Sequence, residues 1–237
     1  MRILKPQHVI VGKDQIEGHK ILKHIEKIAR TCYKSEDLIN DESAEKMIKK
    51  LIKLNHLAMI EHASVSVLFT CDRGVTHEIV RHRVASYAQE STRYVNYSKD
   101  KFGNEIGIVK PDWVIDYKPN LDFMGYVEAL NNYGNGEWLK FDYWIFANLT
   151  CEWCYMNLIE LGAKPEEARD ILPMDLQTEL YHTAFISDWI HFFKLRAWNS
   201  KGNKPHPEAR KLARMVFDKF VELGLVSEQL RIDNEIT

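Results

Sequence analysis

Residues 81–94 read RHRVASYAQESTRY and combine three arginines, a histidine and several hydroxyl side chains. The chain as a whole carries a formal net charge of −2, so this stretch is a local concentration of positive charge. One arginine near a helix end is explained by the helix dipole, but the dipole does not account for three. In an extended segment Ser91 and Arg93 would point to the same side, where a hydroxyl and a guanidinium can share one phosphate. The stretch therefore predicts an anion site.

Two further arginines follow apolar helical patterns, Arg169 in EEARDILP and Arg196 in HFFKLRAW. The neighbours of Arg196 are expected to be buried, and a buried arginine needs a partner. No acid lies within one helical turn of Arg196 in the sequence, so we expect its partner to be a ligand. The residues alone thus predict a site for a phosphorylated small molecule that also forms hydrogen bonds.

Other motifs have simpler interpretations. GNGEWLK (134–140) lacks the third glycine of a dinucleotide fingerprint and is expected to be a turn between helices. CEWC (151–154) falls in the middle of a helical pattern without a second C-x-x-C, so its cysteines are interpreted as packing residues rather than a redox pair or zinc site. The histidines of NHLAMIEH (55–62) are six residues apart and do not share a helix face, which argues against a metal-ligand pair. We predict no metal site.

The bulk composition allows a single globular domain over residues 1–237. With 237 residues and 45% hydrophobic side chains the chain can bury a sizeable core, and no shift in composition marks a boundary. The near-neutral charge argues against a surface that attracts nucleic acid or anionic lipid throughout. The start of the chain lacks a signal-peptide pattern and no segment is long and apolar enough for a membrane span. Four cysteines do not make a disulfide framework, so we expect a cytoplasmic protein.

Hydrophobic periodicity predicts the elements that position these residues. The 75–82 helix should deliver Arg81 and His82 at its C-terminal end, and residues 199–207 should form a mobile loop. Many helices with a few non-sequential strands indicate the α+β class, with a small, mostly antiparallel sheet. Strands are expected over 64–70, 105–111 and 176–186, and helices over 14–33 (with Asp14 as N-cap), 43–56, 75–82, 120–131, 137–161, 165–173, 187–197 and 206–223.

The stretch RHRVASYAQESTRY resembles the signature of the flavin-dependent thymidylate synthases. In that signature R-H-R is followed by seven residues and then serine, here Arg81 to Arg83, 84–90 and Ser91, with Arg93 and Tyr94 completing it. NHLAMIEH, EEARDILP and HFFKLRAW resemble three further segments of the family, in the family's order. The resemblance therefore runs from about residue 50 to 215.

The resemblance implies methylation of dUMP to dTMP. The carbon would come from methylenetetrahydrofolate, and FAD, recharged by NADPH, would be the reductant. The implied fold is the α+β fold of thymidylate synthase-complementing proteins. It would assemble as a homotetramer whose active sites are shared between subunits.

The resemblance also implies roles for individual residues. Arg196 would face the uracil and favour the electron-rich ring that is deprotonated at N3, which makes it the catalytic candidate. The dUMP contacts implied are Glu78, Arg81, Gln89, Glu90, Ser91, Thr92, Arg93, Arg169 and Arg196. The FAD contacts implied are His56, Ala58, Arg81, His82, Arg83, Gln89, Phe185, Ser187 and His191.

The chain departs from the family's pattern at a few of these positions. Ala58 stands where a hydroxyl residue is usual, and Ala88 and Gln89 replace an Asn–Glu pair. Glu78 stands where glutamine is common. A carboxylate near a dianionic nucleotide is unfavourable, so we expect Glu78 to pair with Arg81 or to turn away.

Two other functions fit parts of the same pattern. A protein that binds single-stranded nucleic acid would place the arginines of 81–93 on phosphates and stack bases on Tyr87, Tyr94 and Tyr97. The near-neutral charge and the absence of lysine from residues 72–97 count against it. A nucleotide hydrolase without a flavin would need clustered acids for a metal, and the sequence shows none.

Overall fold

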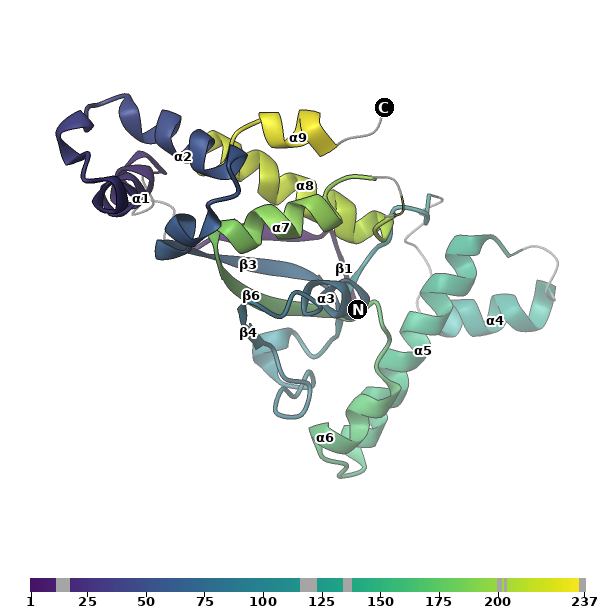
Figure 1. Ribbon diagram of the computed structural model, residues 1–237. Helices are drawn as coiled ribbons and strands as arrows, with labels where there is room; N and C mark the ends of the chain where they lie inside the picture. The colour runs from purple at the N-terminus through teal and green to yellow at the C-terminus, as the bar shows by residue number, and fades with distance from the viewer. Residues whose placement is uncertain (12–17, 116–122, 134–137, 200–201, 203, 235–237) are drawn as a thin grey trace. The chain divides into compact units, whose positions relative to one another are not determined.

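The computed structural model describes residues 1–11, 18–115, 123–133, 138–199, 202 and 204–234 (Figure 1). The chain divides into two compact units. Unit 1 comprises Met1–Pro6, Thr70–Thr76 and Gln89–Glu179, and unit 2 comprises Gln7–Phe69, His77–Ala88 and Leu180–Thr237. The single domain over 1–237 stays a prediction.

A four-stranded sheet has the order β2-β3-β6-β4, formed by Gln7–Ile10, Ser64–Asp72, Gln177–Phe185 and Ser86–Gln89. Ser66 Oγ lies 2.7 Å from Thr183 Oγ, while the Arg73 amide donates to Met174 O at 3.1 Å. Residue numbers along β3 therefore rise as those along β6 fall, so these strands are antiparallel. The buried residues of β3 and β6 alternate with more exposed ones, as the sequence pattern predicts for strands with one covered face.

Helices α7 (Ile186–Arg196) and α8 (Pro207–Glu222) of unit 2 lie side by side along the sheet (Figure 1). Their buried aromatic residues build the core of this unit. Trp189 is fully buried, and its ring centroid lies 6.4 Å from Phe69 on β3 and 5.2 Å from Phe220 on α8. This packing fixes the helix that ends in Arg196.

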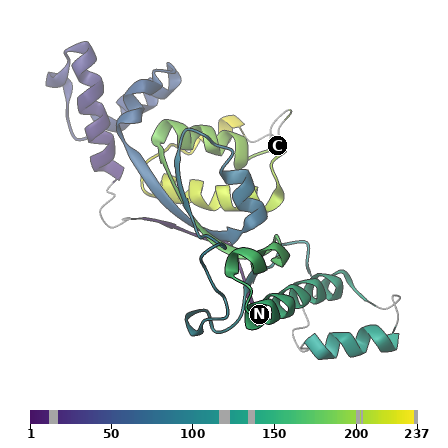
Figure 2. The same ribbon diagram turned by 90° about the horizontal axis from the view of Figure 1, so that it is seen from below.

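Helices α1 (Gly18–Tyr33) and α2 (Ser43–Lys53) also belong to unit 2 and pack against each other (Figure 2). A buried polar network joins them. Arg30 Nε donates to Glu26 Oε1 at 2.8 Å, and Ser43 Oγ donates to Glu26 Oε2 at 3.0 Å. Glu26 is fully buried, so these bonds satisfy a charge that would otherwise be costly. Short 3-10 helices follow α1 and α2, at Glu36–Leu38 and Leu57–His62.

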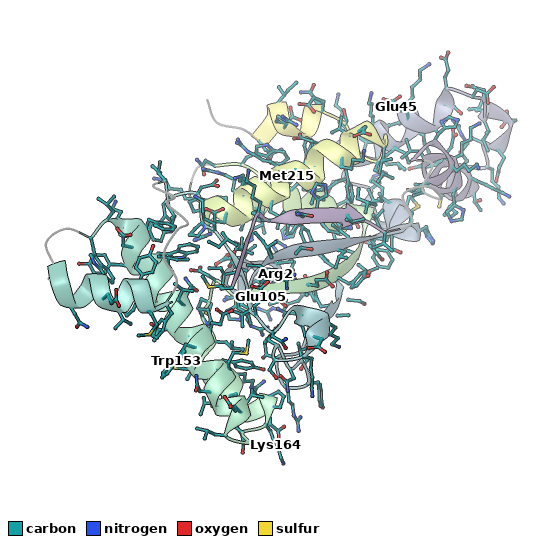
Figure 3. All side chains as sticks on the ribbon, turned by 180° about the vertical axis from the view of Figure 1, so that it is seen from behind. Arg2, Glu45, Glu105, Trp153, Lys164 and Met215 are labelled. Atoms are coloured by element: carbon teal, nitrogen blue, oxygen red, sulfur yellow. The ribbon has the colours of Figure 1, made fainter. Side chains whose placement is uncertain are left out.

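Unit 1 contains a parallel pair of strands, β1 (Arg2–Leu4) and β5 (Gly107–Val109). Arg2 and Glu105, which are labelled in Figure 3, form an ion pair beside this sheet with Nε and Oε1 3.2 Å apart. The core includes Tyr97, Ile106, Ile108, Trp144, Tyr155 and Leu176. Unit 1 also contains the helices α4 (Phe123–Tyr133), α5 (Lys140–Glu160) and α6 (Pro165–Ala168), with 3-10 turns at Asp100–Phe102 and Arg169–Ile171.

The α+β class is confirmed, and most predicted elements are present with shifted ends. The 43–56 helix ends at Lys53, before Asn55 takes a left-handed φ of 57°. The 165–173 helix becomes α6 followed by a 3-10 turn. The sequence interpretation did not include β1, β2, β4 or the helix α9 (Gln229–Asn234).

Some expectations lie wholly or partly outside the described residues: the Asp14 N-cap, the start of the 120–131 helix, most of the 134–140 turn and part of the 199–207 loop. Among the helices that the structure describes, none combines the length and apolar character needed to cross a bilayer.

Candidate active site

The Arg81–Arg83 segment lies in the connection between α3 (Arg73–Ile79) and β4. The expected 75–82 helix is therefore wrong at both ends, and Arg81 and His82 lie beyond it. Tyr87 gives the physical reason. Its hydroxyl lies 3.0 Å from Ile79 O and 2.7 Å from His82 O, so a side chain on β4 satisfies carbonyls that a longer helix would have used.

A cavity of about 210 Å³ opens beside this segment in unit 2. Arg81 and Arg83 are exposed, and neither forms an ion pair or side-chain hydrogen bond within the described residues. The cavity thus brings together four of the residues predicted for FAD with the catalytic candidate. Its lining consists of Arg81, His82, Arg83, Val84, His182, Asp188, His191, Leu195 and Arg196.

Arg196, on the last turn of α7, already has protein partners. Its Nε donates to His82 Nε2 at 3.1 Å, and its Nη1 pairs with Glu78 Oε2. A ligand, the partner considered from the sequence, is therefore not needed to pair with Arg196, because the acid comes from a residue 118 positions away on α3. Of the two expectations for Glu78, the pairing with Arg81 is wrong, whereas Glu78 does lie outside the lining of the cavity.

Two histidines of the cavity lining, His82 and His182, are held neutral. Burial, with smaller contributions from the charges of Arg196 and His191, lowers the pKa of His82 to about 4. Burial also lowers the pKa of His182 to about 3, with a smaller contribution from His82. A neutral His82 can accept the hydrogen bond from Arg196 through Nε2, which a protonated imidazole could not do.

His182 is a cavity residue that the sequence interpretation missed. It is 2% exposed, its ring lies 4.2 Å from that of Trp189, and its Nδ1 has no hydrogen-bond partner. The signal was present, because His182 takes a buried-face position in the alternation of β6, where the other buried residues are Thr178, Leu180 and Ala184. A histidine at such a position is a buried polar group, and buried polar groups need a hydrogen-bond partner.

The remaining residues predicted for FAD in unit 2 lie on α7 and on the 3-10 helix Leu57–His62. Phe185 is the N-cap of α7, and Ser187 in its first turn is buried with an Oγ that lacks a partner. The Ile186 amide donates to Ala63 O at 3.1 Å, which ties the start of α7 to the end of the 3-10 helix. His56 and Ala58 are exposed at the beginning of that helix.

The donor set of unit 2 fits a flavin dinucleotide. Arg81 and Arg83 offer unpaired guanidinium groups of the kind that bind a diphosphate. His182 Nδ1 and Ser187 Oγ are buried polar atoms without partners, and such atoms are rare unless a ligand or water satisfies them.

Residues 89–93 belong to unit 1, and Ser91–Arg93 do not form the extended segment that would align their side chains. The amides of Tyr94 and Val95 both donate to Ser91 O, at 3.1 and 3.0 Å, which makes this segment a turn. The Arg93 amide lies 3.3 Å from Ser91 Oγ. The turn therefore keeps the Ser91 hydroxyl at the backbone of Arg93.

Arg93 and Arg169 lie on either side of Glu166. Arg93 Nε pairs with Glu166 Oε2 at 2.9 Å, while Arg169 Nε lies 4.0 Å from Asp170 Oδ1. Arg93 lowers the pKa of the Glu166 carboxyl, with smaller contributions from Lys164 and Arg169. Both arginines are exposed, at 57% and 43%, so their ion pairs are screened by water and weak.

Gln89, Glu90 and Thr92 face the interior of unit 1 rather than solvent. Gln89 Nε2 donates to Thr76 Oγ1 at 3.1 Å, and Thr92 is 8% exposed. Glu90 accepts a hydrogen bond from the Tyr97 hydroxyl at 3.0 Å, and burial raises the pKa of its carboxyl. Tyr97 is itself buried, so it cannot stack on a base. This removes one of the three tyrosines on which a nucleic-acid site would depend.

None of the four cysteines lines the cavity of unit 2. Cys151 and Cys154 are half-buried free thiols in the middle of α5, as the sequence indicated, and burial raises the pKa of Cys151. Cys71 is buried on β3, and burial raises the pKa of its thiol as well. A raised pKa disfavours the thiolate, which is the nucleophilic form.

Residues 18–223 match the family model described as thymidylate synthase complementing protein. A flavin-dependent thymidylate synthase from Geobacter sulfurreducens is 30% identical over 177 residues, which are 71% of this chain and 65% of that protein. The chain thus spans just under two thirds of the length of this relative.

Two solved structures share the fold at 18% identity. A UMP/dUMP methylase from Streptomyces cacaoi, bound with 5-Br UMP, has a TM-score of 0.70. The alignment covers 98% of this chain and 96% of the methylase chain. Thymidylate synthase X from Helicobacter pylori, with FAD and dUMP, has a TM-score of 0.64 and covers 89% of this chain and 94% of its own. With the match over residues 18–223, this chain belongs to the thymidylate synthase complementing proteins, the family of the flavin-dependent thymidylate synthases.

Proposed function

We propose that this protein converts dUMP to dTMP, with methylenetetrahydrofolate as carbon donor and FAD, reduced by NADPH, as reductant. The observation that carries the proposal is the cavity of unit 2. It combines two unpaired arginines, neutral histidines and an arginine whose guanidinium is held in place by two side chains. Family membership supports the same reaction.

Arg81, His82, Arg83, His191 and Ser187 would hold FAD, together with His56 and Phe185. When bound, the flavin supplies the reducing equivalents for the methyl group. Arg81 and Arg83 would bind the diphosphate, since each offers a planar set of donors without a competing acid. His182 would donate or accept one hydrogen bond through its free Nδ1 and keep water from the buried end of the cavity. Ala58 offers no side-chain hydrogen bond, so a hydrogen bond to FAD at this position would have to come from the backbone.

Arg196 would act on the pyrimidine. A guanidinium against the ring edge favours the form that is deprotonated at N3, because it places positive charge where negative charge develops. The ring then carries more electron density at the carbon that accepts the methyl group. In the absence of nucleotide, His82 and Glu78 hold the guanidinium beside the cavity.

The residues of unit 1 would bind the remainder of the nucleotide. Arg93 and Arg169 would contact its phosphate together with the Ser91 hydroxyl. Their exposed ion pairs with Glu166 and Asp170 are weak enough for a dianionic phosphate to replace. Gln89, Glu90 and Thr92 would support the residues that contact the nucleotide, since their own side chains face the interior of unit 1.

We also propose a homotetramer in which each site draws on two subunits. Unit 1 exposes several large apolar side chains, which another copy of the chain would cover. They include Tyr94, Trp113, Ile115, Tyr143, Trp153 and Leu161, each between 46% and 86% exposed.

The absorbance spectrum of the purified protein and a turnover assay test the function. The protein, as purified or after incubation with FAD, should show the yellow absorbance of an oxidised flavin. With NADPH and methylenetetrahydrofolate it should release tritium from dUMP labelled at C5 and form dTMP in equal amount. A protein that retains no flavin after reconstitution, or a holoenzyme that releases no tritium, would contradict the proposal.

A further inference from the structure

The ion pair between Glu78 and Arg196 joins two elements of unit 2 at the edge of the cavity. Glu78 lies on α3 and Arg196 on the last turn of α7. The side chain of Arg196 is 18% exposed and that of Glu78 is 40% exposed, so solvent reaches the acid more readily than the base. Arg196 contributes to the cavity lining and Glu78 does not. The acid therefore contacts Arg196 from outside the space where a ligand would lie.

The hydrogen bonds of Arg196 determine what it can offer a ligand. A guanidinium presents two forks, one formed by Nε and one terminal nitrogen and the other by the two terminal nitrogens. Nε donates to His82 Nε2, and Nη1 contacts Glu78. In each of these two pairs of donors, one nitrogen therefore already contacts a protein group. A planar acceptor such as a pyrimidine edge must share or displace one of these partners.

The two partners differ in what displacement costs. His82 is a neutral acceptor, whereas Glu78 is a carboxylate that forms a charge-assisted contact with Arg196. A carboxylate beside Arg196 also offsets the positive charge that would stabilise an anionic ring. Glu78 therefore opposes pyrimidine binding in two ways, by occupying a donor and by neutralising its charge.

We propose that Glu78 competes with the pyrimidine ring for Arg196 and thereby sets the affinity of this protein for its nucleotide. The inference rests on the proposed function, in which Arg196 faces the pyrimidine. It makes Glu78 a positioning and affinity-setting residue that acts through Arg196, and not a direct contact of dUMP.

The substitution Glu78→Gln tests the competition, because it removes the charge and keeps the shape and one acceptor oxygen. The FAD-loaded holoenzyme is titrated with dUMP by calorimetry in the absence of folate. The Kd for dUMP should fall roughly two- to fivefold, the scale of a partly exposed ion pair. The gain should shrink at high salt, since the pair is open to solvent. Glu78→Asp, which keeps the charge, should bind dUMP no more tightly than the wild type does.

Three controls isolate the contact. Glu222→Gln removes a carboxylate from an ion pair with Lys219 on α8 and should leave the Kd unchanged. Titration with 2-deoxyribose 5-phosphate, which lacks the pyrimidine, should give the same Kd for Glu78→Gln and wild type. In an Arg196→Ala background Glu78→Gln should have no effect on dUMP binding, as a double-mutant cycle requires for a residue that acts through its partner.

The outcomes separate this inference from the proposed function. If the wild type makes dTMP but Glu78→Gln binds dUMP no more tightly, only the inference fails. Equal tightening toward 2-deoxyribose 5-phosphate would also overturn it, because Glu78 would then act on the phosphate by long-range charge. If the wild-type holoenzyme neither binds dUMP nor forms dTMP, the proposed function and the inference fail together.

Discussion

The arginines of unit 2 and those of unit 1 are held in different ways. Arg196 in unit 2 is 18% exposed, fixed at Nε by His82 and at Nη1 by Glu78, and it ends a helix packed into an aromatic core. Arg93 and Arg169 in unit 1 lie on turns, are 57% and 43% exposed, and contact acids that are themselves open to solvent. One arginine is oriented by the fold, whereas the other two are anchored mainly by their backbone.

This difference matches the chemistry proposed for each set. A pyrimidine edge is recognised by direction, so its arginine must be held in one plane. A phosphate dianion accepts hydrogen bonds from many directions, and flexible, exposed arginines with a hydroxyl satisfy it. Buried contacts in unit 2 therefore fix the orientation of Arg196. The accessible groups of unit 1 supply positive charge for the phosphate.

The largest expected effect concerns whether the two sets serve one site. Ser91→Ala in unit 1 and Arg196→Ala in unit 2 should each be nearly inactive as pure proteins, since each damages every site. If each site takes Ser91 from one chain and Arg196 from another, co-refolding equal amounts should create sites with both intact residues. With random mixing about a quarter of the sites would be intact, so the mixture should recover a clear fraction of wild-type activity.

Mixed oligomers must first be demonstrated, for example by mass spectrometry of chains carrying different tags. Hybrid oligomers that form and remain inactive would mean that both residues serve a site within one chain. The proposed sharing between subunits would then be wrong, although the chemistry could still hold.

Arg196→Lys should have the next largest effect. Lysine keeps the positive charge but cannot contact His82, Glu78 and a planar ring at fixed angles. Turnover should fall by roughly 10²-fold or more, the scale of losing one preorganised donor. Flavin absorbance should be unchanged. Arg93→Lys is the matched change in unit 1, and we expect a smaller loss because phosphate binding depends less on direction. Equal losses would contradict the contrast between the two sets.

The fold could be predicted where local pattern and burial agree. The alternation of β3 and β6 and the apolar stripe of α8 gave the right elements with ends shifted by a few residues. The short strands β1, β2 and β4 were missed because each is too short to show a period, and they are strands only through pairing with distant partners. The end of α3 depends on Tyr87, a residue eight positions further along the chain than Ile79, and no helix signal could reveal that bond.

The candidate site divides in the same way. Motif spacing identified Arg81, His82, Arg83 and Arg196, which line one cavity. It could not identify the partner of Arg196, because Glu78 is near it only in the folded chain. The extended interpretation of Ser91–Arg93 failed because the turn is set by backbone hydrogen bonds to Ser91 O rather than by alternation. Contacts between distant segments, not residue types, carried the missing information.

The smallest expected effect concerns stability in acid and again contrasts the two units. His182 has an ordinary pKa of 6.5 in the unfolded chain and about 3 in the folded protein, where burial is the main cause. Between these values the unfolded chain binds a proton that the folded protein does not, so the free energy of unfolding decreases as the pH falls. His82, with a pKa of about 4, adds to the same loss. In unit 1, Arg93 lowers the pKa of the Glu166 carboxyl, so the contribution of this exposed pair is lost as the pH falls through the range of carboxyl groups.

Replacing His182 with phenylalanine should therefore flatten the pH dependence without greatly changing stability at neutral pH, because Phe69, Trp189 and Phe192 surround the ring. Between about pH 6.5 and 4.5 the wild type should lose up to about 2–3 kcal/mol more of its free energy of unfolding than His182→Phe does. Urea unfolding of the holoenzyme in excess FAD across this range measures the difference. His24→Phe, which removes an exposed histidine from α1, is the control and should follow the wild type. Parallel curves for wild type and His182→Phe would show that His182 takes up its proton in the folded protein, and hence that it is not held neutral in the cavity.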